Sequence, residues 1–415
     1  MALPRRGTLG PRVGTFSIVA GSVARWLAEG KGVALICGVG RRRRPASFCP
    51  GTPMRHVRTL VFLILAAALP LGAQQTTPAM VKRLLTGLAD DSMQGRATGT
   101  PGAMRAATMI AAEMKRIGLE PMGDSGFFQR VPVTAGDSVK QFRRTRVPDP
   151  TDPAKSIMKV DSSSFTWRVP LKTLTSMAAY DSAPTARRRP SVNVVGVLRG
   201  SDPALKAEHI LIDAHYDHLG MRGPGVNGDS IYNGADDDAS GVTAVLEIAR
   251  QFAKGPRPKR TVVFAATTGE EVGLVGTNWY IAHPALPLEQ MVANLEIEMI
   301  MRPDSLAGGS GRAWLTGYER STMGEMLAAN GIPIGPDKRP AQNFFQRSDN
   351  IAFARRGIVA HTLSTFNLHT DYHQLSDDAS HADYDHMTGV INAGAKAARL
   401  LSDGPKPEWK AGGKP

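Results

Sequence analysis

Apolar and polar residues in the second half of the chain follow two different patterns. Short runs rich in β-branched and other apolar residues are typical of strands, and several are nearly continuous, as in strands buried on both faces. Five such runs occur, at residues 192–200, 209–218, 260–271, 291–300 and 357–365. Residues 241–253 and the segment after Asp383 instead carry apolar residues at helical spacing.

The N-terminal part has a different pattern. Residues 79–120 place apolar residues at helical spacing on both sides of the Gly-rich stretch GRATGTPG, which predicts a helical layer. Residues 133–190 are rich in Pro, Ser and charge, and they predict an irregular region or a hairpin rather than a second core. The alternation of strands and helices favours an α/β fold with three layers, αβα, around a central mixed, mostly parallel sheet.

Residues 54–73 have the three parts of a secretory signal. Arg55 and Arg58 form a basic start, an apolar run extends from Leu60 to about Leu71, and small residues end at Ala73. The apolar run is shorter than the roughly 20 residues that span a bilayer. We therefore expect export to a periplasm or the extracellular space with cleavage near Ala73 and no stable membrane anchor, the alternative being a stop-and-anchor segment.

Most of the formal net charge of +13 lies in residues 1–73, which include this signal. Residues 1–73 hold eleven Lys and Arg and one acid, so that the rest of the chain carries only about +3. The basic balance therefore gives no support for a nucleic-acid partner. Both cysteines, Cys37 and Cys49, precede Met54. A metal site in the remainder must use His, Asp and Glu.

Polar residues gather where the predicted strands end, which is where ligands bind in open α/β sheets. His215 and Asp217 are spaced so that both can lean to one side, where an imidazole can bind a metal while a carboxylate orients the ring. A His–Asp pair on a loop is the simpler interpretation of this motif alone. His218 is expected to be structural.

Acids form three further groups. Asp236, Asp237 and Asp238 precede the helix at 241–253, where Asp238 or Ser240 could act as its cap, but three acids are more than a cap needs.

The adjacent acids Glu270 and Glu271 end one strand run and repel each other unless a cation lies nearby. Glu296 and Glu298 alternate with apolar residues in another run, and an inward-facing acid there needs a partner.

The C-terminal segment LHTDYHQLSDDASHADYDH adds His369, His373, His381 and His386, each of which alone is best interpreted as a surface residue. Taken together, these His and carboxylate groups suit a divalent metal such as zinc. Two metals about 3.5–4 Å apart form a recurrent hydrolytic site.

The motifs HYDHLG, GADDDASG, GEEVGLVG, NLEIEMI and YHQLSD follow one another in a familiar order. Between about Leu85 and Leu401 the chain resembles the co-catalytic di-zinc aminopeptidases, relatives of secreted bacterial leucyl aminopeptidases and of glutamate carboxypeptidase II. The resemblance implies two Zn²⁺ per chain, held by His215, Asp237, Glu271, Glu298 and His373, with Asp237 as the bridge.

It also implies that Glu270 is the general base, that Asp217 supports His215 from behind, and that Tyr372 helps to stabilise the tetrahedral intermediate. There are two departures from the family pattern. Glu298 stands where Asp is usual, and Met301 stands where Gly is common. Glu296 is the alternative ligand if the register is shifted.

The expected function is that of an exported zinc exopeptidase, an aminopeptidase that hydrolyses peptides with a free N-terminus through a zinc-bound hydroxide and a Glu base. The alternatives are a glutaminyl-peptide cyclotransferase with a single zinc and a non-catalytic binding protein on the same fold. Side-chain specificity and oligomeric state remain open. Residues 74–415 are expected to form a single metallopeptidase domain, divided into a helical layer (79–145), an irregular insert (146–190), a catalytic core (191–402) and a disordered tail (403–415).

Because the signal begins at Met54, we expect that residues 1–53 are a disordered extension produced by an upstream start assignment. N-terminal sequencing of the natural product tests this expectation. A mature chain that retains any residue before Met54 would contradict it.

Overall fold

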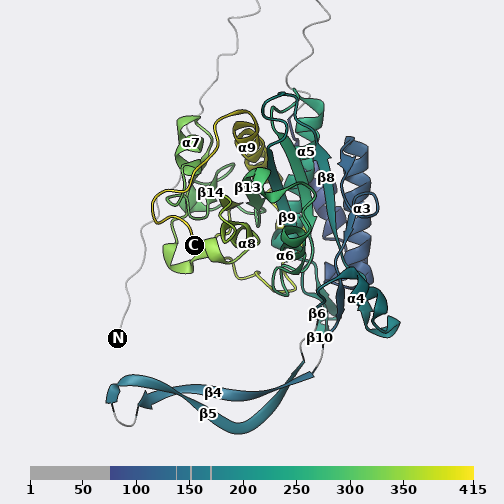
Figure 1. Ribbon diagram of the computed structural model, residues 1–415, viewed down its shortest axis with the longest axis vertical. Helices are drawn as coiled ribbons and strands as arrows, with labels where there is room; N and C mark the ends of the chain where they lie inside the picture. The colour runs from purple at the N-terminus through teal and green to yellow at the C-terminus, as the bar shows by residue number, and fades with distance from the viewer. Residues whose placement is uncertain (1–74, 137, 150–151, 169–170) are drawn as a thin grey trace, which may run out of the picture. The chain divides into compact units, whose positions relative to one another are not determined.

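A central sheet of nine strands organises the computed structural model, which describes residues 75–136, 138–149, 152–168 and 171–415. Its strands lie in the order β1 (Glu120–Pro121), β8 (Val192–Leu198), β12 (Thr261–Thr267), β9 (His209–His215), β13 (Met291–Ile297), β16 (Ala360–Ser364), β14 (Ala313–Leu315) and β15 (Ile334–Pro336), and β2 (Phe128–Arg130) also pairs with β8 (Figure 1). Residues 1–74, and with them the expected extension and signal, lie outside the described part.

The four central strands β12, β9, β13 and β16 run parallel, and antiparallel pairings with β8 and β14 flank them. Thr267 lies opposite His215, and Glu296 lies opposite Asp213. The carboxyl ends of these strands therefore meet at one edge of the sheet. The expected mixed sheet is confirmed, with its parallel part at the centre.

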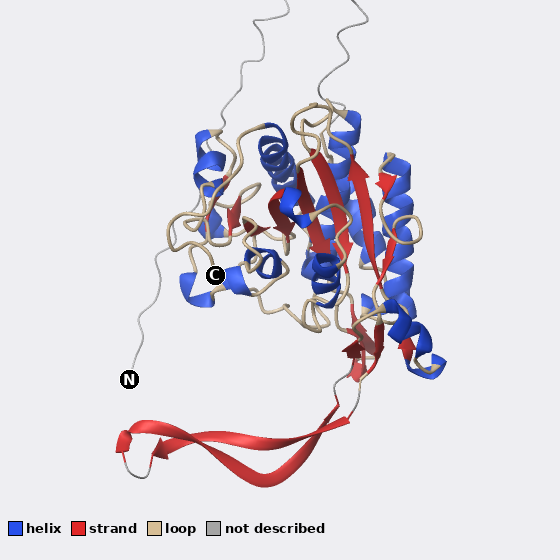
Figure 2. Cartoon of the chain, viewed as in Figure 1, coloured by secondary structure: helices blue, strands red, loops and turns tan. Residues whose placement is uncertain are grey.

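Side chains alternate between two apolar layers along each central strand, as the pleat requires. In β9, Ile210 and Ile212 belong to one buried cluster, and Leu211 belongs to the other. Four helices cover the first face: α2 (Pro78–Leu88), α3 (Pro101–Ile117), α5 (Gly241–Lys254) and α9 (Tyr384–Asp403). Helices α6 (Val275–Ala282) and α8 (Asn350–Ala354) cover the second, so the three-layer α/β fold is confirmed (Figure 2).

The helical layer is shorter than the expected 79–145. Helix α3 ends because Gly118 adopts a left-handed conformation with φ of 91°, and the N–H of Leu119 returns to the carbonyl of Met114. The chain then enters the strands β1, β2 and β3 (Val133–Ala135). The expectation was wrong because a glycine cap redirects the chain into the sheet.

The insert expected to be irregular at 146–190 is largely regular. Strand β4 (Ser138–Asp149) pairs antiparallel with β5 (Asp152–Arg168), while β6 (Leu171–Thr173) and β7 (Arg188–Arg189) both pair with β3. The short helix α4 (Met177–Ser182) lies between β6 and β7, and a separate hairpin joins β10 (Gly220–Val226) to β11 (Asp229–Tyr232). The β4–β5 pair agrees with the hairpin, the second interpretation given for residues 133–190, and backbone hydrogen bonds hold such ladders without an apolar pattern.

The tail expected to be disordered at 403–415 is ordered instead. Lys410 N–H donates to the carbonyl of Arg320, just before α7 (Met323–Ala329), and Trp409 Nε1 donates to the carbonyl of Gly357 at 2.9 Å. The Trp409 ring also lies against Phe345. These partners are distant in sequence, so the local Gly, Pro and Lys content of the tail gave no sign of them.

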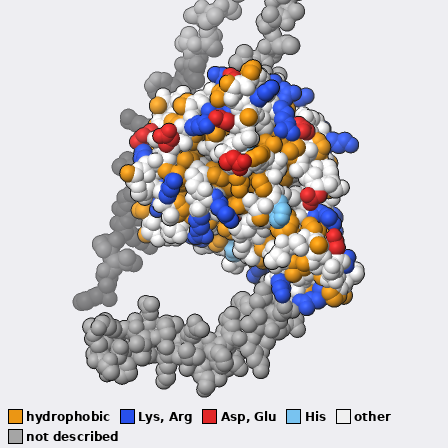
Figure 3. Space-filling view, in the orientation of Figure 1, with side chains coloured by type: hydrophobic (Ala, Val, Ile, Leu, Met, Phe, Trp, Pro, Cys, Tyr) orange, Lys and Arg blue, Asp and Glu red, His pale blue; other side chains and the backbone are white. Residues whose placement is uncertain are grey.

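Figure 3 shows one face of the molecule, on which Lys and Arg side chains form several small groups among hydrophobic and acidic ones. Among the described helices, none is long and apolar enough to cross a membrane.

We expect that Trp409→Ala lowers the free energy of unfolding by about 1–3 kcal/mol, because it removes a packed indole and leaves the carbonyl of Gly357 without its donor. Denaturant titration measures the change. Lys414→Ala, on an exposed tail side chain, is the control and should change the value by less than about 0.5 kcal/mol. Equal stability of the Trp409 variant and the wild type would show that the tail does not contribute.

Candidate metal centre

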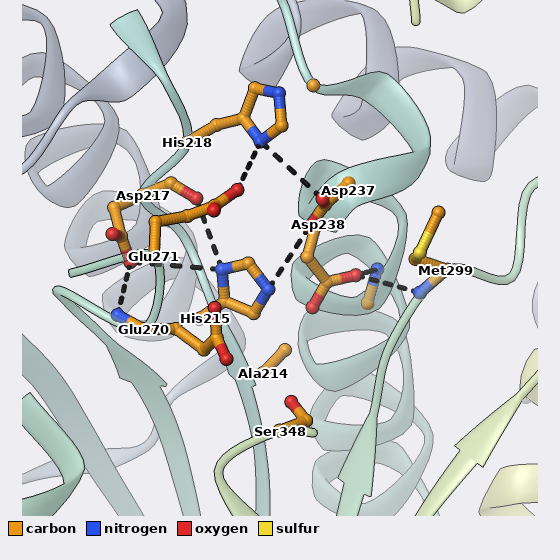
Figure 4. A network of polar contacts seen from close by, with 12 residues as sticks. Ala214, His215, Asp217, His218, Asp237, Asp238, Glu270, Glu271, Met299 and Ser348 are labelled. Atoms are coloured by element: carbon orange, nitrogen blue, oxygen red, sulfur yellow. Dashed lines mark hydrogen bonds and ion pairs between the residues drawn. The ribbon is translucent and has the colours of Figure 1, made fainter. Parts of the chain in front are cut away.

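Each central strand delivers one part of a polar cluster at the same edge of the sheet. His215 is the last residue of β9, Glu270 and Glu271 follow β12, and Glu298 follows β13. The loop after β16 carries His373. The turn η4 (Ala235–Ser240), directly before α5, supplies the acidic run, and Figure 4 shows several of these side chains converging.

Asp237 lies between two groups of potential metal ligands. Its Oδ1 is 3.3 Å from His215 Nε2, and its Oδ2 is 3.1 Å from His373 Nε2. One group contains His215, Asp237 and Glu298, and the other contains His218, Asp237, Glu271 and His373. In each group the donor atoms lie within 4.8 Å of one another. The structure therefore brings together all five predicted ligands.

His218, which was expected to be structural, lies beside the second ligand group. Its Nδ1 is 2.8 Å from Glu271 Oε1 and 3.8 Å from Asp237 Oδ2 (Figure 4). The second histidine of HYDHLG was its only signal in the sequence, because a position three residues after His215 does not reveal where the loop turns. Of the other histidines, His369 contacts Asp236 at 2.8 Å and belongs to neither group.

The three acids of η4 have different partners. Asp238 Oδ1 accepts the N–H of Gly241 at 2.8 Å and that of Met299 at 3.1 Å, so it ties the start of α5 to the end of β13. Asp236 Oδ1 accepts the N–H of Met301 at 2.8 Å. Only Asp237 reaches the ligand groups, as the bridging assignment requires.

Two buried residues hold the ligand loops in place. Asp377 accepts the backbone N–H groups of Asp236 and Asp237 at 2.9 and 3.1 Å. Arg96, from the stretch GRATGTPG, donates to the carbonyls of Tyr216, Leu88, Asn233 and Gly234. This fully buried guanidinium thereby fixes the His215 loop against the entry to η4.

The support of His215 by Asp217 stays a prediction, because the Asp217 carboxylate lies near His215 but has its hydrogen bonds elsewhere. Nδ1 of His215 lies 3.1 Å from the backbone carbonyl of Asp217 and 3.8 Å from its Oδ1. The carboxylate instead accepts the N–H of Glu270 at 3.1 Å and the hydroxyl of Thr98 at 2.9 Å. Its main contact is therefore with the loop that carries the predicted base.

Glu296, the alternative ligand, is satisfied without a metal. Its carboxylate accepts the hydroxyl of Thr362 at 2.7 Å, the N–H of Asn350 at 2.9 Å and the hydroxyl of Ser348. It belongs to neither ligand group. Glu298 is the acid that joins His215 and Asp237 in a ligand group, and it lies one residue beyond the end of β13.

Burial and mutual repulsion make the cluster electrostatically strained. Burial, together with the charges of Glu298 and Asp349, raises the pKa of Glu270 well above its usual value. Burial and the charge of Glu296 raise the pKa of Glu298 to about 8, and burial raises that of Asp217 to about 6. For Asp237, burial is outweighed by His215 and His373, so its pKa falls well below the usual range. A buried cation would stabilise the ionised carboxylates.

Several donor atoms of the two ligand groups are also suited to a metal because they have no hydrogen-bond partner. Among the described residues, His215 Nε2, His218 Nδ1 and Glu271 Oε1 are buried and have no hydrogen-bond partner. Imidazole nitrogens and carboxylate oxygens are zinc ligands.

A narrow pocket adjoins the Glu298 side of the cluster. Its walls include Glu298, Arg347 and the aromatic rings of Trp314, Phe344, Phe366 and Tyr372. The ring of Tyr372 stacks on that of His373, with centroids 3.9 Å apart. Burial raises the pKa of Tyr372, so its hydroxyl remains protonated at neutral pH.

Residues 193–397 match the family model of Peptidase family M28. The structure is similar to an aminopeptidase from Aneurinibacillus sp. strain AM-1, with a TM-score of 0.52 and 15% identity over 81% of this chain and 96% of that one. It is also similar to BSAP, a zinc aminopeptidase from Bacillus subtilis, with a TM-score of 0.51 and 14% identity over 79% and 95% of the chains. The family match confirms the resemblance inferred from the motifs, and the structural matches confirm the fold.

Relatives found by sequence include vacuolar membrane proteases of two fungi. The protein of Tuber melanosporum is 26% identical over 51% of this chain and 21% of its own length, and that of Verticillium alfalfae is 28% identical over 47% and 18%. The chain thus spans about a fifth of the length of the curated relatives it matches. Their vacuolar location contradicts the expected periplasmic or extracellular localisation, which rested on residues outside the described part.

We expect that Arg96→Met lowers the free energy of unfolding by at least about 2 kcal/mol, because it leaves several buried carbonyls without donors. The bound metal per chain, measured by elemental analysis, should fall as well, since the ligand loops lose their tie. Arg105→Met is the control, because the exposed Arg105 donates to a carbonyl of the same N-terminal layer. An Arg96 variant as stable and as metal-rich as this control would contradict the assignment.

Proposed function

Because residues 193–397 of the chain form a Peptidase family M28 domain, we propose that the protein is an aminopeptidase that uses two zinc ions to hydrolyse peptides with a free N-terminus. The observation that carries the proposal is the position of Asp237, whose two carboxylate oxygens face two separate ligand groups. A single carboxylate between two sets of donors suits a pair of ions.

The chain supplies a complete set of residues for both ions. His215 and Glu298 would hold one of them, Glu271 and His373 would hold the other, and Asp237 would contact both. When bound, the two zinc ions polarise the scissile carbonyl and lower the pKa of the attacking water. A glutaminyl-peptide cyclotransferase with one zinc would need only one of these groups.

Glu270 is the proposed general base. It lies next to the ligand Glu271, its backbone is held by the carboxylate of Asp217, and His215 and Glu298 are its strongest charged neighbours. From this position its carboxylate accepts the proton of the attacking water and then delivers it to the leaving amine. Tyr372, on the pocket wall, would donate its hydroxyl proton in a hydrogen bond to the developing oxyanion.

The pocket beside Glu298 would receive the first side chain of the substrate. Its aromatic rings favour an apolar side chain, and the carboxylate of Glu298 on its wall favours the cationic α-amino group of a free N-terminus. Arg347 on the same wall favours a second candidate, a carboxypeptidase, because a guanidinium there could pair with a terminal carboxylate.

We expect that Glu270→Gln lowers kcat by about 10²–10⁴-fold while two zinc ions remain bound, because it removes the proton acceptor and not a ligand. Glu271→Gln is the matched comparison on the neighbouring carboxylate, and it should lose zinc. Steady-state kinetics and elemental analysis measure the two effects. A Glu270→Gln rate within about threefold of the wild type would exclude the general-base role.

The substrate class is tested with aminoacyl p-nitroanilides, their N-acetylated forms, and N-blocked dipeptides with a free carboxylate. We expect hydrolysis of the free-amine substrates with apolar side chains, loss of activity on chelation, and recovery with zinc. Phe344→Ala should raise KM for these apolar substrates more than for the alanyl substrate. Cleavage of the N-blocked dipeptides alone would favour the carboxypeptidase.

A further inference from the structure

His218 is buried beside the second ligand group, where two carboxylates face its Nδ1. The residue is 2% exposed, and its Nδ1 lies at an ion-pair distance of 2.8 Å from Glu271 Oε1 without the alignment of a hydrogen bond. Among the described residues its Nε2 has no hydrogen-bond partner either. Burying an imidazole in this way is unfavourable unless something else binds it.

The distances between the His and carboxylate atoms around His218 are similar to those between the ligands of a single metal ion. His373 Nε2 is 3.1 Å from Asp237 Oδ2 and 3.2 Å from Glu271 Oε1, while His218 Nδ1 is 3.8 and 2.8 Å from the same two oxygens. A tetrahedral zinc site with bonds of 2.0–2.1 Å has ligand atoms about 3.3 Å apart. These four His–carboxylate distances, which are four of the six edges of such a tetrahedron, lie within about 0.5 Å of that value.

The backbone leaves room for this ring in particular. Gly234, with φ of 57°, lies so close that a Cβ at this position would be 2.5 Å from His218 Cγ. The same Cβ would be 2.2 Å from the carbonyl oxygen of Asp237. The imidazole therefore packs against a glycine at the entry to η4, the turn that carries Asp237, and its edge faces the ring of His373 at 5.6 Å between centroids.

We propose that His218 is a zinc ligand, so that the two zinc pockets are unequal: a filled pocket with four protein donors (His218, Asp237, Glu271, His373) and an open pocket with three (His215, Asp237, Glu298). The proposal rests on the two-zinc site proposed above. Structural zinc sites have four protein ligands, whereas catalytic sites keep one position free. The filled pocket therefore retains its ion, and the open pocket accepts the substrate.

The surroundings of the open pocket agree with this division. The narrow pocket with aromatic walls includes Glu298 but none of the residues found only in the filled group. The proposed substrate pocket thus lies on the three-donor side.

X-ray absorption spectroscopy of the wild-type full chain loaded with one equivalent of zinc tests the proposal directly. The filled pocket predicts two imidazole ligands in the first equivalent, and the open pocket predicts one. A first equivalent with two imidazoles supports the proposal, and one with a single imidazole overturns it. This measurement needs no variant.

A competition titration with a zinc chelator provides the second test. His218→Ala should weaken the tighter zinc site at least about 10-fold, because even residues that only orient zinc ligands are worth 10–100-fold in affinity. His361→Ala is the matched control, since it removes another fully buried imidazole, one bonded to Ser321 and Thr316. Its two zinc affinities should remain those of the wild type.

The outcomes separate this proposal from the proposed function. If His218→Ala leaves both zinc affinities unchanged, His218 is not a ligand, although a two-zinc peptidase would still stand. If the wild type binds two zinc ions as described here but cleaves no peptide, the proposed function fails while the unequal pockets stand. If the His218 variant does not fold, the imidazole count of the wild type decides.

Discussion

The structure depends on one electrostatic constraint. Carboxylates that are buried together at one edge of the sheet need positive charge beside them. Burial raises the pKa values of Glu270, Glu298 and Asp217, and repulsion from neighbouring carboxylates adds to the effect at each of them. Histidines and the buried Arg96 lie nearby, but several donor atoms among the described residues still lack partners. Divalent ions between the carboxylates would relieve this cost, which explains why adjacent acids such as Glu270 and Glu271 can be tolerated at a strand end.

The same constraint explains why the site contains more acidic residues than two metal ions need as ligands. Asp377 and Asp238 each accept two backbone N–H groups, and Asp217 accepts one. Each of these bonds fixes a loop that carries a ligand or the proposed base. A carboxylate is a strong acceptor for this purpose, because an ionised acceptor forms the stronger hydrogen bonds. The acid-rich motifs therefore combine metal ligands with the residues that hold the ligand loops rigid.

The sequence predicted the central strands, helices α5 and α9, and the residues that meet at the metal centre, because apolar periodicity and strand ends are local properties. It could not predict features that depend on distant contacts. The tail is held by Arg320 and Gly357, which its own composition does not indicate. For residues 133–190 the sequence left a hairpin and an irregular region as alternatives, and only the backbone pairing of β4 with β5 decides between them. His218 was missed for a related reason, since only the turn after His215 brings its ring to Glu271.

Glu296 and Glu298 show how a small difference in position decides a role. Both acids alternate with apolar residues, and the sequence alone left either as the ligand. Strand β13 ends at Ile297, so Glu296 is still inside the sheet, where hydroxyl and amide groups of the α8 region and β16 satisfy its carboxylate. Glu298 lies beyond that end, where the chain turns toward Asp237 and His215. The longer side chain of Glu, where Asp is usual, gives this position the reach to join them. The end of one strand thus separates an acid that stabilises the sheet from one that can hold a metal.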